Sequence, residues 1–158
     1  MNTKQRYVLD DDSCDRSDVV KVCRSMLAGL RDSVVDYETD VPAASEDWSP
    51  DVAAAADTLR KVAATTGRIE RGGYAQTGRI RADSDVIWSA FVVFAPWAYD
   101  ATVWDEVGNP LLSFADEAGS ITATLDQTQY KSVLPVLGPA RLVPEKEWSQ
   151  LAKARRSH

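Results

Sequence analysis

Apolar residues recur every three or four positions in two stretches near the start of the chain. Such spacing places them along one face of an α-helix. The first stretch covers about residues 17–38. The second begins where Ser49 can cap a helix that has Pro50 at its first position, and Gly67 would end it near Thr66. We therefore expect two amphipathic helices in this part of the chain.

Residues 85–95 are apolar at almost every position, interrupted by Asp85 and Ser89. A short apolar run of this kind is typical of a strand that is covered on both faces. Pro96 would end the strand, because proline cannot donate to the hydrogen-bond ladder. The pattern therefore predicts a buried strand at 85–95 that needs a cover on each side.

The second half of the chain alternates short apolar segments with turn residues. Gly108-Asn109 and residues 116–119 are expected turns. Asp126 and Pro144 mark the starts of two short helices. Further strands are expected at about 5–9, 99–107, 110–115, 119–125 and 140–143, with a hairpin or a pair of short strands around Gly72-Gly73.

The order of these elements predicts an α+β fold. Two N-terminal helices pack on one face of a four- to six-stranded, mainly antiparallel sheet, and short helices follow at the C-terminal end. The 158 residues fit one domain, and no linker divides them. We expect the termini, residues 1–4 and 156–158, to be loose.

Histidine and cysteine are too scarce for several common reaction types. His158, at the end of the chain, is the single histidine, and Cys14 and Cys23 are the two cysteines. Ser-His and Cys-His catalysis both need an imidazole held beside the nucleophile. Zinc sites need more histidine or cysteine ligands than these. We therefore assign no catalytic residue, metal or cofactor, expect both thiols to be reduced, and favour a protein that is not an enzyme.

The chain starts without the apolar segment of a signal peptide. No apolar run approaches the roughly 20 residues that cross a bilayer. We therefore expect a cytoplasmic protein that does not contact a membrane.

The net charge of −6 is unevenly distributed. Residues 67–81 and 141–158 each carry a net charge of +3, whereas the other segments are acidic. Nucleic-acid binding needs a broad basic surface, so nucleic acid is not the expected partner. The arginines in the first basic segment either contact an anion or balance the acidic surface from a solvent-facing hairpin; they are Arg68, Arg71, Arg79 and Arg81.

Acidic and aromatic residues also gather in two further places. Asp10, Asp11, Asp12 and Asp15 either hold a hard cation or form a solvated turn that caps a helix, and their spacing favours the turn. Around the strands at 99–125, aromatic residues stand beside acids. Either Trp97 and Trp104 close the edge of the core, or these residues form a contact surface. The expected partner-binding residues are Trp97, Tyr99, Asp100, Trp104, Glu106, Asp116 and Glu117.

These observations favour a non-catalytic, acidic module that binds a protein with a basic surface. Immunity proteins, antitoxins and secretion chaperones are small acidic proteins of this general kind. One alternative is a small-ligand carrier or enzyme with a pocket between sheet and helices, lined by Tyr74, Trp88, Phe91 and Tyr130. Another is a homo-oligomeric unit, such as a homodimer, in which a second subunit covers the strand at 85–95.

Overall fold

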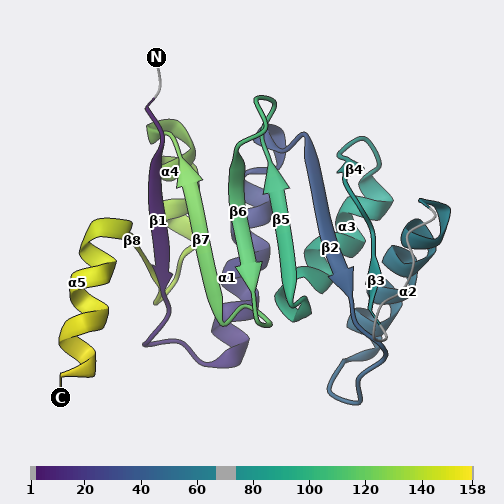
Figure 1. Cartoon of the computed structure of the whole chain (residues 1–158), viewed down its shortest axis with the longest axis horizontal. Coiled ribbons are helices and arrows are strands. Elements are labelled where there is room, and N and C mark those ends of the chain that lie inside the picture. Colours follow the sequence, from purple (N-terminus) through teal and green to yellow (C-terminus); the bar gives the residue numbers. More distant parts are fainter. Residues whose placement is uncertain (1–2, 67–73, 158) are drawn as a thin grey trace.

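The computed structural model describes residues 3–66 and 74–157, which form an α+β fold with an open antiparallel sheet (Figure 1). Within these residues the strand order is β3-β2-β5-β6-β7-β1-β8, and β4 also pairs with β2. The strands are β1 (Gln5–Asp10), β2 (Asp36–Val41), β3 (Ala75–Gln76), β4 (Ile80–Arg81), β5 (Asp100–Trp104), β6 (Pro110–Ala115), β7 (Ser120–Leu125) and β8 (Arg141–Pro144).

Four of the five described α-helices lie behind the sheet in Figure 1, and the C-terminal helix lies beside β8. None of them is both long enough and apolar enough to traverse a bilayer. The helices are α1 (Arg16–Gly29), α2 (Pro50–Thr65), α3 (Asp85–Phe94), α4 (Gln127–Val133) and α5 (Glu145–Arg156), with short 3-10 turns η1 (Arg31–Ser33), η2 (Ala95–Trp97) and η3 (Leu134–Val136).

The predicted strands of the second half are confirmed. β5, β6 and β7 form an antiparallel meander, and β1 pairs with the outer side of β7. Alternation then separates the two faces of the sheet. Val103, Leu112 and Ala123 are paired neighbours that face the helices and are buried. On the opposite face, Thr102 pairs with Ser113, so this face is polar in the centre of the sheet.

The prediction of a strand at 85–95 is wrong, because this segment is helix α3. The Ser84 hydroxyl accepts the N–H of Ile87 at 3.4 Å and caps the helix. Trp88, Phe91 and Phe94, spaced three residues apart, are its buried residues. A run that is apolar at nearly every position fits a buried helix as well as a buried strand, because it carries no clear period.

This correction removes the reason for expecting a second subunit. As a helix, α3 is covered by its own chain: Phe91 packs against Tyr37 of β2 with ring centres 4.6 Å apart, and Trp48 packs against Phe94 at 5.5 Å. The predicted requirement for a cover on both faces of a strand therefore does not arise.

The first helix is shorter than predicted. Helix α1 ends at Gly29, and residues 36–38, predicted as the end of that helix, belong instead to strand β2. Tyr37 fits both patterns: it continues the helical spacing, and in a strand it shares a face with the buried Thr39 and Val41. Pairing with β5 decides between them, since Tyr37 lies opposite Val103. The second predicted helix is confirmed as α2, with Ser49 as its cap.

The expected turn at Gly72-Gly73 lies outside the described residues. The short strands that follow it do not pair with each other. Both β3 and β4 pair with β2, through Val41 opposite Ala75 and Tyr37 opposite Ile80. The segment from β3 to β4 therefore runs along β2 and forms the edge of the described sheet on that side.

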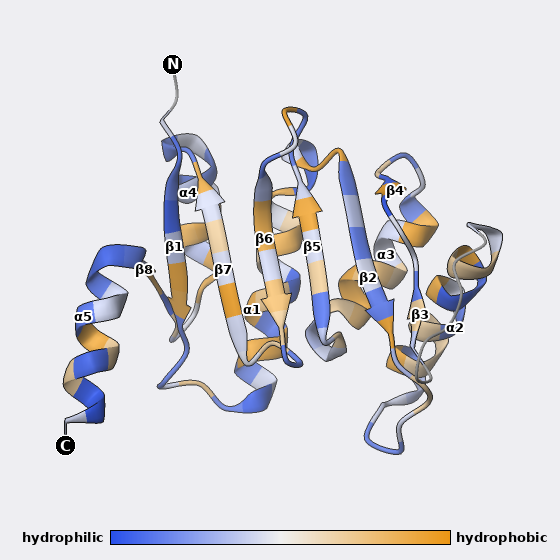
Figure 2. Ribbon diagram, in the orientation of Figure 1, coloured by the Kyte–Doolittle hydropathy of each residue, from blue (hydrophilic) through white to orange (hydrophobic). Residues whose placement is uncertain are grey.

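Helix α5 differs from the other helices in its position and polarity. It is mostly hydrophilic in Figure 2, and none of its residues is fully buried. Its Arg155 forms an ion pair of 3.2 Å with Asp10, which alternates with the inward-facing Leu9 and so lies on the polar face of the sheet. Arg141 of β8 joins the same carboxylate at 2.8 Å. Burial raises the pKa of Asp10, but the hydrogen bonds from the two arginines outweigh it and lower the pKa overall.

Candidate partner-binding surface

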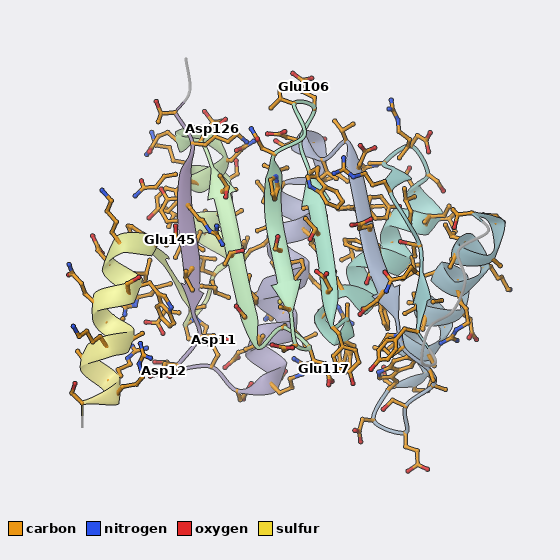
Figure 3. The ribbon with its side chains drawn as sticks, viewed as in Figure 1. Asp11, Asp12, Glu106, Glu117, Asp126 and Glu145 are labelled. Atoms are coloured by element: carbon orange, nitrogen blue, oxygen red, sulfur yellow. The ribbon has the colours of Figure 1, made fainter. Side chains whose placement is uncertain are left out.

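The seven residues predicted to contact a partner do not form one surface. Glu117 and Glu106 lie at opposite ends of the sheet (Figure 3). Tyr99, Asp100 and Asp116 belong to the end that holds Glu117, because backbone hydrogen bonds join the start of β5 to the turn between β6 and β7. We call this end of the sheet, with residues Tyr74, Tyr99, Asp100, Asp116 and Glu117, the acidic end.

The turn after β6 is held firmly against the residues that precede β5. The N–H of Asp116 donates to the carbonyl of Tyr99 at 3.0 Å, and the N–H of Glu117 donates to the carbonyl of Ala98 at 2.9 Å. Asp116, Glu117 and Ala118 all have positive φ angles, of 54°, 57° and 63°. Non-glycine residues rarely adopt this conformation, which costs about 1 kcal/mol or more at each position. Burial of the Ala118 side chain anchors the turn and leaves both acidic side chains exposed.

Tyr99 is the exposed aromatic residue of the acidic end. Its side chain is 40% exposed, and its ring packs edge-to-face on Tyr74 with centres 5.5 Å apart. Tyr74 and then the carboxylate of Glu117 raise the pKa of the Tyr99 hydroxyl. At neutral pH the phenol of Tyr74 is uncharged, so the carboxylate of Glu117 is the negative charge that makes the potential at the Tyr99 hydroxyl favour cations.

The buried carboxylate of Asp40 binds the backbone of the acidic end. Oδ1 of Asp40, on β2, accepts the N–H groups of Tyr99 at 3.0 Å and Asp100 at 3.3 Å. Burial raises the pKa of Asp40, and the negative charge of Asp100 adds to that rise, although the two N–H groups oppose it. Asp40 therefore fixes the backbone of the acidic end, and its ionisation costs free energy in the folded state.

We predict that Asp40→Asn increases stability at neutral pH. Because the folded state raises the pKa of Asp40, its contribution to stability is complete below the unfolded pKa and is lost as the pH rises through the folded pKa. An asparagine oxygen accepts the same two N–H groups without a charge. The expected gain at pH 7 is on the order of 1 kcal/mol, measured by urea unfolding. It should shrink as the pH falls from the raised folded pKa toward the unfolded pKa of about 4, and a gain that is equal at every pH would contradict the assignment.

A second acidic segment reaches the same end of the molecule. Asp11 and Asp12 lie at the end that holds Glu117 (Figure 3). The guanidinium of Arg16, in the first turn of α1, donates to the carbonyl of Glu117 and, at 2.8 Å, to that of Pro96. This arginine therefore ties the start of α1 to the turn after β6.

The aspartates at 10–15 also have structural roles. Asp15 caps α1, and it forms a reciprocal capping box with Asp18. Asp10 and Asp12 pair with Arg155. In residues 3–66 and 74–157, no group of three or more acidic, histidine or cysteine side chains has an arrangement suited to a metal ion.

The two tryptophans of the predicted set lie elsewhere. Trp104 is only 9% exposed, on the polar face of the sheet, where Arg79 covers its ring at 4.0 Å. Trp97 is half-buried on the helical side, near the guanidinium groups of Arg16 and Arg24. Neither tryptophan lies on the exposed surface around Tyr99.

The predicted anion-binding arginines are only partly described. Arg68 and Arg71 lie outside the described residues. Arg79 and Arg81 are both exposed, but Arg79 stacks on Trp104. Their side chains point to the polar face of the sheet, because they alternate with the buried Ile80.

The four residues predicted to line a ligand pocket are not brought together. Trp88 and Phe91 pack in the core with ring centres 5.6 Å apart. Tyr130 stacks on Tyr7 at 4.9 Å, and Tyr74 belongs to the acidic end. This set therefore does not define a shared cavity between sheet and helices.

Comparison with known protein families, with curated proteins and with solved structures finds no match for this chain.

Three residues important for the acidic end, Arg16, Asp40 and Tyr74, were not assigned to it from the sequence. Arg16 and Asp40 stand among residues of ordinary helix and strand patterns, and nothing local marks their contacts with the segment at 96–117.

Proposed function

We propose that this protein is a non-catalytic binding module whose acidic end docks on a basic surface of another protein. The observation that carries the proposal is the exposed Tyr99, surrounded by carboxylates that come from separate parts of the chain. Asp100, Asp116 and Glu117 are exposed and form no ion pair with the residues that the structure describes.

Complementary charge speeds association and suppresses wrong partners, whereas an aromatic ring with a polar tip contributes contact area. The acidic end offers both on a backbone that is fixed by Asp40 and Arg16. Little conformational entropy is therefore lost when a partner binds this surface.

We also propose a cytoplasmic location, where reducing conditions keep thiols such as Cys14 and the buried Cys23 free.

The test compares two variants in capture from native host lysate followed by mass spectrometry. The first is Tyr99→Ala/Asp116→Asn/Glu117→Gln, which removes one exposed ring and two charges from the acidic end. It should lose a basic protein that the wild type retains, with at least about tenfold weaker affinity for the purified partner. Wild-type binding should also weaken steeply with added salt, because the attraction is electrostatic.

The matched control is Asp32→Asn/Glu106→Gln/Val107→Ala. It also removes two acidic charges and an exposed apolar side chain, but from the opposite end of the sheet. It should bind like the wild type. Equal loss in both variants would argue for general acidity instead of a localised surface, and capture of a second copy of the chain would favour self-association.

A further inference from the structure

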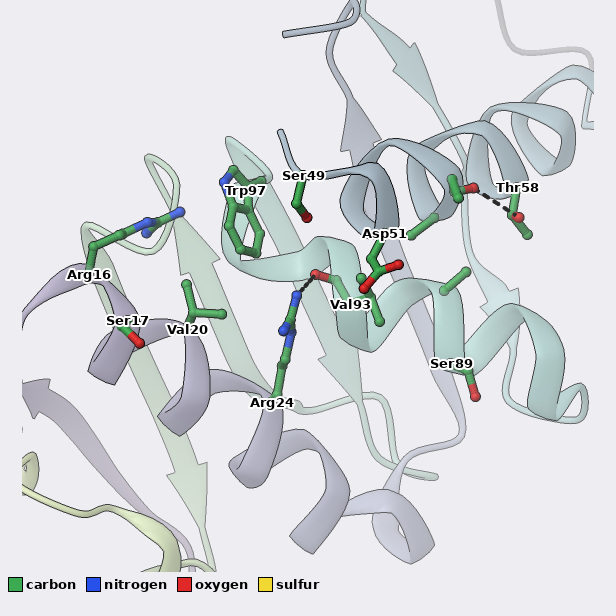
Figure 4. Close-up of a pocket in the computed structure, with 13 residues that line it drawn as sticks. Arg16, Ser17, Val20, Arg24, Ser49, Asp51, Thr58, Ser89, Val93 and Trp97 are labelled. Atoms are coloured by element: carbon green, nitrogen blue, oxygen red, sulfur yellow. Dashed lines mark hydrogen bonds between the residues drawn. The ribbon is translucent and has the colours of Figure 1, made fainter. Parts of the chain in front are cut away.

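A groove on the helical side of the molecule has a different chemistry from the acidic end. It has a volume of about 720 Å³ and lies between α1, α2 and α3, with Trp97 at one end (Figure 4). Its walls are mostly small or apolar side chains. They include Val20, Ala54, Ala90 and Val93, whose short side chains do not fill the groove.

Two guanidinium groups line this groove beside the same indole ring. Arg16 lies 5.0 Å and Arg24 lies 5.4 Å from the centre of the Trp97 ring. Asp51 is the acidic residue among the groove's lining residues. The groove therefore carries a net charge of +1 in a chain whose net charge is −6.

Arg24 is held in place but is not fully paired. One of its terminal nitrogens donates to the carbonyl of Val93 at 2.9 Å, across the groove from α1 to α3 (Figure 4). Its Nε is buried and has no hydrogen-bond partner in the described residues. Burial lowers the pKa of Arg24, and Asp51 partly opposes that. Because Nε is buried, a ligand in the groove reaches Arg24 through its terminal nitrogens, which keep N–H groups beyond the one bonded to Val93. An anion that supplies acceptor oxygens forms charge-assisted hydrogen bonds with these N–H groups.

We propose that this groove binds a small organic carboxylate with a flat apolar body. The carboxylate would accept hydrogen bonds from the terminal nitrogens of Arg24. The positive charge of Arg16, whose terminal nitrogens already donate to the carbonyls of Glu117 and Pro96, would add to the attraction. The apolar body would lie against Trp97 and the alanine and valine walls, which offer contact area without competing hydrogen-bond donors. A cationic ligand would meet two like charges, and a neutral one would form weaker hydrogen bonds with the guanidinium groups than a carboxylate does.

The test uses NMR titration of the full chain with 2-naphthoate and with its neutral counterpart 2-naphthamide. Naphthoate should shift backbone amides of α1, α2 and α3, and it should bind at least tenfold more tightly than the amide. Arg24→Gln should lower naphthoate affinity at least tenfold. Arg79→Gln is the matched control, because Arg79 also stacks on a tryptophan but lies outside the groove, and it should leave the affinity unchanged.

A second variant keeps the test valid if Arg24→Gln disturbs packing. Ala54 is an exposed residue of the groove wall, so Ala54→Leu fills the space without changing a charge or the core. It should abolish binding while the spectrum keeps its folded dispersion. Equal affinity for acid and amide, binding that Ala54→Leu does not affect, or no shifts with millimolar naphthoate would each overturn the proposal. None of these outcomes bears on partner capture by the acidic end.

Discussion

Phe91→Ala is expected to lower the free energy of unfolding by about 3–5 kcal/mol. Phe91 is fully buried in α3, and its ring contacts Tyr37 at 4.6 Å and Trp88 at 5.6 Å between centres. Truncation removes apolar contacts and leaves a cavity between α3 and the sheet. Single domains are typically stable by about 5–15 kcal/mol, so the loss is a large share of the total. Urea unfolding followed by circular dichroism measures it.

Val86→Ala, on the same helix, is the matched control. Val86 is 75% exposed in the first turn of α3, and removing its methyl groups leaves no cavity. Its effect should stay within about 0.5 kcal/mol. In a two-faced strand at 85–95, Val86 would share a face with Trp88 and both substitutions would be costly. Similar losses for Val86→Ala and Phe91→Ala would therefore contradict the helix.

Asp105→Ala is expected to cost about 2–4 kcal/mol, because this carboxylate organises the turn between β5 and β6. Its side chain is almost fully buried, and Oδ1 accepts the N–H groups of Val107 at 3.0 Å and Asn109 at 2.9 Å. The other oxygen pairs with Lys4 at 2.8 Å and so fastens the chain before β1. Alanine leaves these donors without their partner. Thermal and urea unfolding measure the loss.

The effect of Asp105 should depend on pH. Burial raises its pKa, but the hydrogen bond from Lys4 and the N–H groups of the turn outweigh burial and lower the pKa overall. For a carboxyl group with a lowered pKa, the stabilisation is present above the unfolded pKa and is lost as the pH falls through the folded pKa. The difference between wild type and Asp105→Ala should therefore shrink on acidification.

Glu106→Ala provides the comparison, since the neighbouring Glu106 is exposed. Its substitution should change the free energy of unfolding by less than about 0.5 kcal/mol at any pH. If the two neighbouring acids behaved alike, the carboxylate of Asp105 would not be holding the turn.

Local sequence signals predicted a large part of the fold. Ser49 with Pro50 marked the start of α2, and Asp126 marked that of α4, because capping depends on a few adjacent residues. The strands of the meander were predicted because alternation and turn residues coincide there. Where the local signal fits two structures, as in residues 36–38 and 85–95, the sequence alone led to the wrong element.

Only the tertiary structure decided which charged residues act together. The sequence determined that the chain is acidic, has a single histidine and carries aromatic and acidic residues around 97–117. Pairing across the sheet then separated Glu106 from Glu117 and covered Trp104 with Arg79. The packing of α1 brought Arg16 to Pro96, and the pairing of β2 with β5 brought Asp40 to Tyr99. Backbone propensity acts over a few residues, whereas these contacts join segments tens of residues apart and form only when the sheet and its helices pack.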